Sequence, residues 1–259
     1  MNDRGDRTPW RWRPDRDNPR AQNLDKVVEI VTDTSRRVAE SVAAGELTLV
    51  LGGDCTVGIG TVGGHVESGQ RVGLVYFDLH ADMNVAASVA PGTLDWMGMA
   101  HMLGEPGTER ALVEVGPTTP LLQPDQVVLL GWGPEEAQSG ERETIERRGI
   151  DAVAVDEVRS DPAAAASRAL ELLGDRAERV LVHFDVDVID FTDTPLSENP
   201  GRNEGVRYED AIATLEALLR SPRLAGVTVT ELNPAHAEEG AGSIERMARD
   251  VARGFAAGR

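Results

Sequence analysis

Apolar residues recur along the chain with two different periods, and their alternation predicts an α/β fold. Short apolar runs of strand length alternate with longer segments whose apolar residues fall on one helical face. Strands are predicted over residues 47–51, 72–77, 126–131, 152–155, 180–184 and 226–230. Helices are predicted over residues 24–38, 57–64, 95–103, 135–148, 163–173, 208–219 and 244–256. Strands separated by helices imply right-handed crossovers and a mainly parallel sheet that helices cover on both faces.

The first residues do not follow this pattern. Residues 1–23 are rich in Arg, Asp and Pro, which predicts an extended N-terminal arm ahead of one domain at 24–259. Trp10 and Trp12 leave two interpretations of the arm open. It is either a flexible tail, or it packs on the domain or on a neighbouring subunit.

Charge and composition limit the functions and locations that are expected for this protein. The formal net charge of −18 argues against nucleic-acid binding and against attraction to an anionic membrane, and it fits a cationic substrate or simple solubility. No apolar stretch reaches the roughly 20 residues that span a bilayer. The single cysteine, Cys55, cannot form an internal disulfide, and the N-terminus lacks the apolar core of a signal peptide. A cytoplasmic protein is expected.

Chemically active residues follow three of the predicted strands. They are Cys55, which ends a Gly-Gly-Asp-Cys segment; Asp78, His80 and Asp82; and Asp185 and Asp187. Ligands of open α/β sheets bind beyond the carboxyl ends of the strands, where all these residues are expected to meet. Crowded carboxylates repel one another, so a positive partner is required, and one or two divalent metal ions would supply it.

The spacing of these residues indicates the kind of metal. Asp78, His80 and Asp82 alternate by two, so an extended chain would turn all three to one side. An aspartate placed between two ions can bridge them. Carboxylate oxygens with one imidazole suit Mn²⁺ and, less decisively, Fe²⁺, Co²⁺ or Zn²⁺.

Four segments resemble the ureohydrolase superfamily, which includes arginases, agmatinases, guanidinobutyrases and formiminoglutamases. They are Gly-Gly-Asp-Cys at 52–55, Phe-Asp-Leu-His-Ala-Asp-Met-Asn at 77–84, His-Phe-Asp-Val-Asp-Val-Ile-Asp at 183–190 and Glu-Leu-Asn-Pro at 231–234. The similarity extends from about residue 24 to the C-terminus. It implies a three-layer α/β/α sandwich with a mainly parallel sheet, two Mn²⁺ ions and a homo-oligomer, commonly a trimer or hexamer.

The resemblance also implies roles for individual residues. Asp78 and Asp185 would bridge both ions, His80 and Asp187 would bind one of them, and Asp82 would bind the other. Glu231 matches the carboxylate that faces the guanidinium group of the substrate. Asn84 matches a position near the substrate.

Cys55 stands where the family usually has a metal-ligating histidine, so the ligands of the second metal site differ from those of the family. Its thiolate could bind Zn²⁺ or Fe²⁺, could hold Mn²⁺ weakly, or could leave one site partly empty. A buried, inert cysteine is the remaining alternative.

The region that carries the proton shuttle in arginase-like proteins also differs. Asp95 occupies the place of the shuttle histidine, and His101, six residues on, is either a substitute or a core histidine. His183 has no motif role, although it adjoins the strand that carries the metal ligands. The loop 131–134 offers no acid to bind the α-amino group of arginine, so Trp132 and Asn199 could line a differently shaped pocket.

The favoured function is metal-dependent hydrolysis of a C–N bond in a small cationic guanidino or amidine-like molecule. A metal-bound hydroxide would attack the central carbon, with urea released from a guanidine. Asp82 would accept a proton, Asp95 or His101 would exchange protons with solvent, and Glu231 would hold the cation. Two alternatives are hydrolysis of an acetylated amine and ligand binding without turnover.

Overall fold

A six-stranded sheet forms the centre of the computed structural model, which describes residues 2–237 and 242–257. The strands are β1 (Thr48–Leu51), β2 (Val72–Phe77), β3 (Val127–Trp132), β4 (Asp151–Ala154), β5 (Arg179–Asp185) and β6 (Leu224–Thr230). The helices are α1 (Leu24–Ala43), α2 (Val57–Val66), α3 (Gly98–Met102), α4 (Arg110–Val113), α5 (Ser139–Arg148), α6 (Val155–Ser160), α7 (Pro162–Leu173), α8 (Tyr208–Leu219) and α9 (Gly242–Ala257). Short 3₁₀ turns include η1 (Leu94–Met97) and η4 (Val186–Val188).

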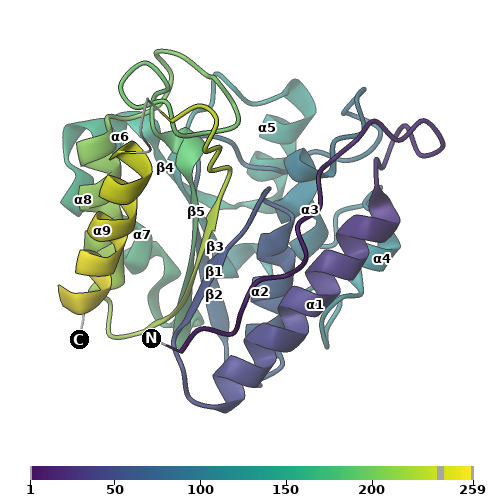
Figure 1. Cartoon of the computed structure of the whole chain (residues 1–259), viewed down its shortest axis with the longest axis horizontal. Helices are drawn as coiled ribbons and strands as arrows, with labels where there is room; N and C mark the ends of the chain where they lie inside the picture. Colours follow the sequence, from purple (N-terminus) through teal and green to yellow (C-terminus); the bar gives the residue numbers. More distant parts are fainter. Residues whose placement is uncertain (1, 238–241, 258–259) are drawn as a thin grey trace.

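All pairings in the sheet are parallel, in the order β1-β6-β5-β2-β3-β4. Helices α1 to α4 lie on one side of the sheet and α6 to α9 on the other (Figure 1). This confirms the predicted three-layer α/β/α sandwich. All six predicted strands are present, with bounds that differ by at most two residues.

Alternate residues of the strands pack into two separate cores, one on each face of the sheet. On β2, Val75 and Phe77 pack with apolar residues of α6, α7, α8 and α9. Leu74 and Tyr76 pack into the opposite core, with residues of α1, α2 and α3. Burial on both faces explains why the strands have continuous apolar sequences rather than alternating ones.

Helix α2 forms from the glycine-rich segment. Its glycines allow it to approach both helix α1 and the sheet closely. A Cβ on Gly60 would lie 2.5 Å from the carbonyl oxygen of Val31, and one on Gly64 would lie 2.5 Å from that of Ser35. The glycines therefore let α2 pack tightly on α1.

Some local features differ from the sequence-based expectations. Val155 begins α6 instead of ending β4, and α6 itself was not predicted. Helix α5 begins at Ser139, four residues later than expected from the pattern. The short helix α4 was not predicted either; with four residues, it is too short for a periodic pattern to reveal.

The N-terminal arm runs in an extended conformation past α1 (Figure 1). Arg7 forms ion pairs with Glu29 and Asp33 of α1, while Trp10 and Trp12 remain 37% and 48% exposed. Within the part of the chain that the structure describes, no helix is both long and apolar enough to cross a membrane.

Candidate metal centre

The carboxyl ends of four strands bring the predicted site residues together. Asp78 directly follows β2, Asp185 ends β5, and Glu231 directly follows β6. Cys55 comes four residues after β1 and just before α2. Because all four strands are parallel, their ends lie at one edge of the sheet.

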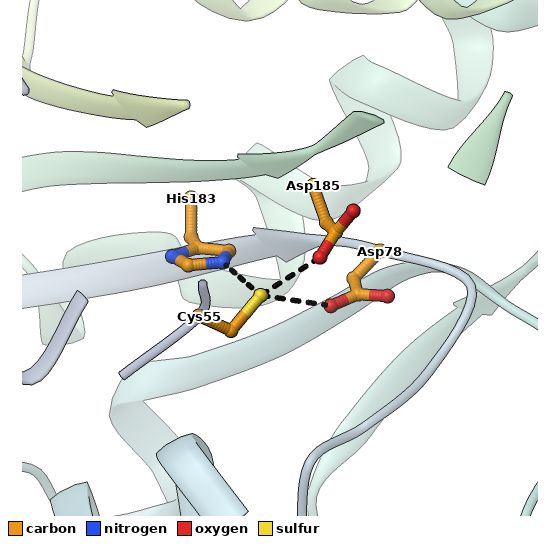
Figure 2. Close-up of side chains that lie close together, drawn as sticks. All are labelled: Cys55, Asp78, His183 and Asp185. Atoms are coloured by element: carbon orange, nitrogen blue, oxygen red, sulfur yellow. Dashed lines mark hydrogen bonds between the residues drawn. The ribbon is translucent and has the colours of Figure 1, made fainter. Parts of the chain in front are cut away.

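The thiol of Cys55 lies at the centre of a first, fully buried group, which Figure 2 shows. Its Sγ lies 2.7 Å from Asp185 Oδ2, 3.2 Å from His183 Nε2 and 4.0 Å from Asp78 Oδ2. Potential ligand atoms of these four side chains all lie within 4.8 Å of one another. The arrangement is compact enough for one ion to contact all four.

A second group consists of Asp78, His80 and Asp187. His80 Nδ1 lies 3.0 Å from Asp187 Oδ2 and 3.5 Å from Asp78 Oδ1. Asp187 Oδ2 also accepts a hydrogen bond of 3.3 Å from the amide of Asn199. Asp187 Oδ1 is buried without a hydrogen-bond partner among the described residues, as expected of an atom reserved for a ligand.

Asp78 belongs to both groups. Its Oδ2 faces Cys55 and its Oδ1 faces His80, so the two oxygens point to different groups. A carboxylate placed in this way can bridge two ions. Asp185 directs Oδ2 to Cys55, and its Oδ1 accepts the backbone N–H of Asp187 at 2.7 Å.

Buried negative charge dominates the electrostatics of the site. Burial and the neighbouring Asp187 raise the pKa of Asp78 to about 7, and burial with several carboxylates raises the pKa of Asp185 well above its ordinary value. Burial alone would lower the pKa of His80, but the carboxylates of Asp187 and Asp78 outweigh it and raise that pKa. A bound cation would favour the charged forms of these buried carboxylates.

The two groups differ in the metals that they fit. Asp78, His80 and Asp187 offer carboxylate oxygens and one imidazole, a set that fits Mn²⁺. The group around Cys55 adds a thiol and the imidazole of His183, and this softer set fits Mn²⁺ less well.

Asp82 lies in neither group. Strand β2 ends at Phe77, residues 78–80 form a bend, and Asp82 adopts a left-handed backbone conformation with φ of +48°. Its Oδ2 accepts a 2.5 Å hydrogen bond from the hydroxyl of Tyr76. The strict alternation expected from the Asp-X-His-X-Asp spacing is therefore broken at its third residue.

Glu231 occupies a strained but well-supported position. Its φ is +62°, a conformation that costs energy for a residue with a side chain. Backbone hydrogen bonds of 2.7 Å fix both sides of the residue, from its N–H to Gly53 and from Glu198 N–H to its carbonyl oxygen. Burial and the nearby carboxylates of Asp54 and Asp187 raise the pKa of Glu231 to about 9.

The remaining predicted residues are placed as follows. Asp95 lies in η1, and its Oδ1 accepts a hydrogen bond from the backbone N–H of Cys55 at 2.7 Å. Asn84 is buried beside Ser88, and Trp132 ends β3 with a buried indole nitrogen that has no partner among the described residues. His101 is fully buried in α3, where Met97 O and the N–H of Glu109 contact its two ring nitrogens at 2.6 and 3.1 Å. Of these four residues, Asp95 is hydrogen-bonded to a residue of the metal groups.

Sequence analysis gave His183 no motif role and did not single out Tyr76, yet both residues lie at the metal centre. His183 belongs to the Cys55 group, and Tyr76 stacks on its ring with centroids 4.2 Å apart. Each lies two residues before a predicted aspartate ligand, Asp185 and Asp78 respectively. The two-residue period of a strand would have placed them on the same side as those ligands.

Comparisons with known proteins agree with this geometry. The model of the arginase family matches residues 9–256. An arginase of Brevibacillus brevis is 30% identical over 212 residues, which cover 82% of this chain and 70% of the relative. The chain therefore belongs to the arginase family.

Solved structures show the same fold. An arginase of Bacillus caldovelox in its native structure superposes with a TM-score of 0.81 at 26% identity, covering 98% of this chain and 81% of that one. A formimidoylglutamase of Bacillus subtilis has a TM-score of 0.73 at 16% identity, with 91% and 67% covered. At that identity the second likeness concerns the fold alone.

Proposed function

We propose that this arginase-family protein is a metal-dependent amidinohydrolase that cleaves a C–N bond of a small cationic guanidino compound. The observation that carries the proposal is the position of Glu231 beside the carboxylates of the metal centre. Its backbone is fixed on both sides in a strained conformation, and its side chain is buried. A strained residue that its surroundings hold in place is typical of a functional site.

The net reaction is the addition of water across a C–N bond. The water oxygen bonds to the guanidino carbon, the bond from that carbon to the amine nitrogen breaks, and the leaving nitrogen takes up a proton. Urea and an amine result. Asp78, His80, Asp185 and Asp187 would hold the metal, which when bound lowers the pKa of water towards neutrality and stabilises developing negative charge.

The chain's own residues bind the substrate and move protons. The Glu231 carboxylate would pair with two N–H groups of the guanidinium and so fix the orientation of its carbon. Asp82 Oδ1 would accept a proton, since Tyr76 occupies Oδ2. Asp95 Oδ2 would exchange that proton with solvent, since its Oδ1 holds the backbone N–H of Cys55.

The test is a panel of guanidino compounds offered to protein reconstituted with metal, with urea and amine release measured. Glu231→Gln should lower kcat/KM about 100-fold, because charge-assisted hydrogen bonds contribute about 1.5–3 kcal/mol. The matched control is Glu198→Gln, a neighbouring exposed carboxylate whose side chain accepts from Asn233. It should retain activity.

Two outcomes would contradict the proposal. Absence of urea and amine release across the panel from fully metallated protein would favour ligand binding without turnover. Hydrolysis of acetylated amines that survives Glu231→Gln would favour an amide hydrolase, because an acetyl amide brings no cation to Glu231.

A further inference from the structure

The histidine that the metal centre lacks at position 55 has a counterpart on another strand. His183 lies on β5, two residues before Asp185, and its Nε2 points at Cys55 Sγ at 3.2 Å (Figure 2). Both side chains are at most 2% exposed. His183 on β5 can therefore supply to a bound metal ion the imidazole that the segment after β1 does not provide.

The surroundings of His183 hold its ring in this place. Tyr76 stacks on one face with an interplanar angle of 11°. On α2, Gly58 leaves the space that the ring needs, since a Cβ there would lie 2.8 Å from His183 Nδ1. Thr230 Oγ1 lies 3.1 Å from His183 Nε2 and 3.3 Å from Cys55 Sγ.

Tyr76 also contacts a second residue of the site through its hydroxyl group. Its hydroxyl donates to Asp82 Oδ2 at 2.5 Å, and Asp82 lies outside the group around Cys55. One tyrosine therefore supports the histidine with its ring and holds the aspartate with its hydroxyl.

We propose that Cys55, His183, Asp78 and Asp185 form a thiolate-containing site for a zinc-type ion (Zn²⁺, Co²⁺ or Fe²⁺). Asp78 also belongs to the second group, with His80 and Asp187, whose donors are mostly oxygen atoms. The centre would then hold two different ions, a zinc-type ion at the Cys55 group and Mn²⁺ at the second group. This inference deepens the proposed function, on which it rests for the role of the centre, although its test needs no turnover.

The chemistry of the donors supports this assignment. One sulfur, one imidazole nitrogen and two carboxylates make a four-ligand set of the kind that Zn²⁺ takes in tetrahedral sites. Thiolate ligands select Zn²⁺ and iron, whereas Mn²⁺ prefers oxygen donors. Because Asp78 turns one oxygen to each group, its carboxylate can serve both ions.

Cobalt provides a direct probe of the proposed thiolate ligand. The metal-free protein of residues 1–259 is titrated with Co²⁺, and absorption is recorded in the near ultraviolet and the visible. A sulfur-to-cobalt charge-transfer band with intense visible bands is expected, since a thiolate in a four-coordinate site produces both. In parallel, X-ray absorption of the zinc-loaded protein should give a Zn–S distance of about 2.3 Å.

Single substitutions test the proposed ligand roles of Cys55 and His183 separately. Cys55→Ser should abolish the charge-transfer band. His183→Phe should weaken Zn²⁺ binding more than about 100-fold, because even residues one step removed from a metal affect affinity by about 10–100-fold. His65→Gln is the matched control, a buried histidine that contacts Thr48 away from the site, and should bind Zn²⁺ like the original protein. Circular dichroism checks that each variant is folded.

The outcome that would overturn the proposal is equally specific. A wild-type protein with neither the charge-transfer band nor a Zn–S distance would show that Cys55 and His183 form only a hydrogen-bonded pair. Unchanged Zn²⁺ affinity in folded His183→Phe would remove His183 from the ligand set. Both results are independent of urea release. Absence of hydrolysis in the substrate panel therefore would not contradict the thiolate site. Absence of the thiolate site likewise would not contradict the proposed hydrolase activity, which the substrate panel tests separately.

Discussion

The rings of Tyr76 and His183 stack at 4.2 Å across two neighbouring central strands. The two residues are paired in the register of β2 and β5, so the stack follows directly from the sheet. Tyr76 is fully buried, and its hydroxyl reaches Asp82. The core of the sheet and the metal centre are therefore connected through one side chain.

Two substitutions at Tyr76 should separate its two contacts. Tyr76→Phe removes the hydroxyl that donates to Asp82, and should lower the free energy of unfolding by about 1–3 kcal/mol because a buried acceptor loses its donor. Tyr76→Leu also removes the stack, which adds about 0.5–1.5 kcal/mol to the loss. Urea unfolding of metal-free protein measures both. Equal stability of the two variants would show that the stack contributes nothing.

Gly58 provides a test of the space behind His183. A Cβ at this position would lie 2.8 Å from Nδ1 and 3.2 Å from the Cε of Met102. Gly58→Ala should therefore cost about 1–3 kcal/mol as an overpacked core site and should shift the imidazole. The control is Gly242→Ala in α9, where nothing lies within 4 Å of the added Cβ. If Gly58→Ala and the control have equal melting temperatures, the ring is not confined by α2.

Removal of divalent ions should destabilise the protein. Without them the buried carboxylates of Asp78, Asp185 and Asp187 repel one another. An ion at a concentration of 100 times its Kd stabilises the folded state by about 2.7 kcal/mol, which for this size of domain raises Tm by roughly 5–10 °C. Calorimetry with excess metal and with a chelator measures the difference.

The matched variant for the metal experiment is Asp187→Asn. It removes one negative charge and one ligand from the group with His80 and should reduce the gain in Tm. A Tm that is the same with metal and with chelator in the original protein would contradict the presence of a metal centre.

The sequence was sufficient to predict the strands and the edge of the sheet at which the site residues meet. Buried parallel strands appear as continuous apolar runs, and the polar site residues come directly after these runs. It was not sufficient for the partners of Cys55. Strand β6 lies between β1 and β5, so the contact of Cys55 with His183 depends on the strand order, which no local pattern contains. The position of Asp82 depends on a positive φ and on a tyrosine hydroxyl, and neither follows from its spacing.

The stability of the protein should also depend on His65, a buried histidine outside the metal centre. Its Nε2 lies 2.9 Å from Thr48 Oγ1, and burial lowers its pKa to about 4. The unfolded chain has a pKa near 6.5 at this residue and so binds the proton more readily. The contribution of neutral His65 is therefore fully present above about pH 6.5 and is lost as the pH falls towards 4, by up to about 3 kcal/mol.

The comparison of the original protein with His65→Gln isolates this contribution, because the metal ligands titrate in both proteins and cancel in the difference. Urea unfolding at several pH values between 7.5 and 4.5 gives the free energy of unfolding of each. The stability of the original protein relative to His65→Gln should be greatest at pH 7.5 and should fall steadily below pH 6.5. A difference that stays constant over this range would mean that His65 does not enter the folded core in its neutral form.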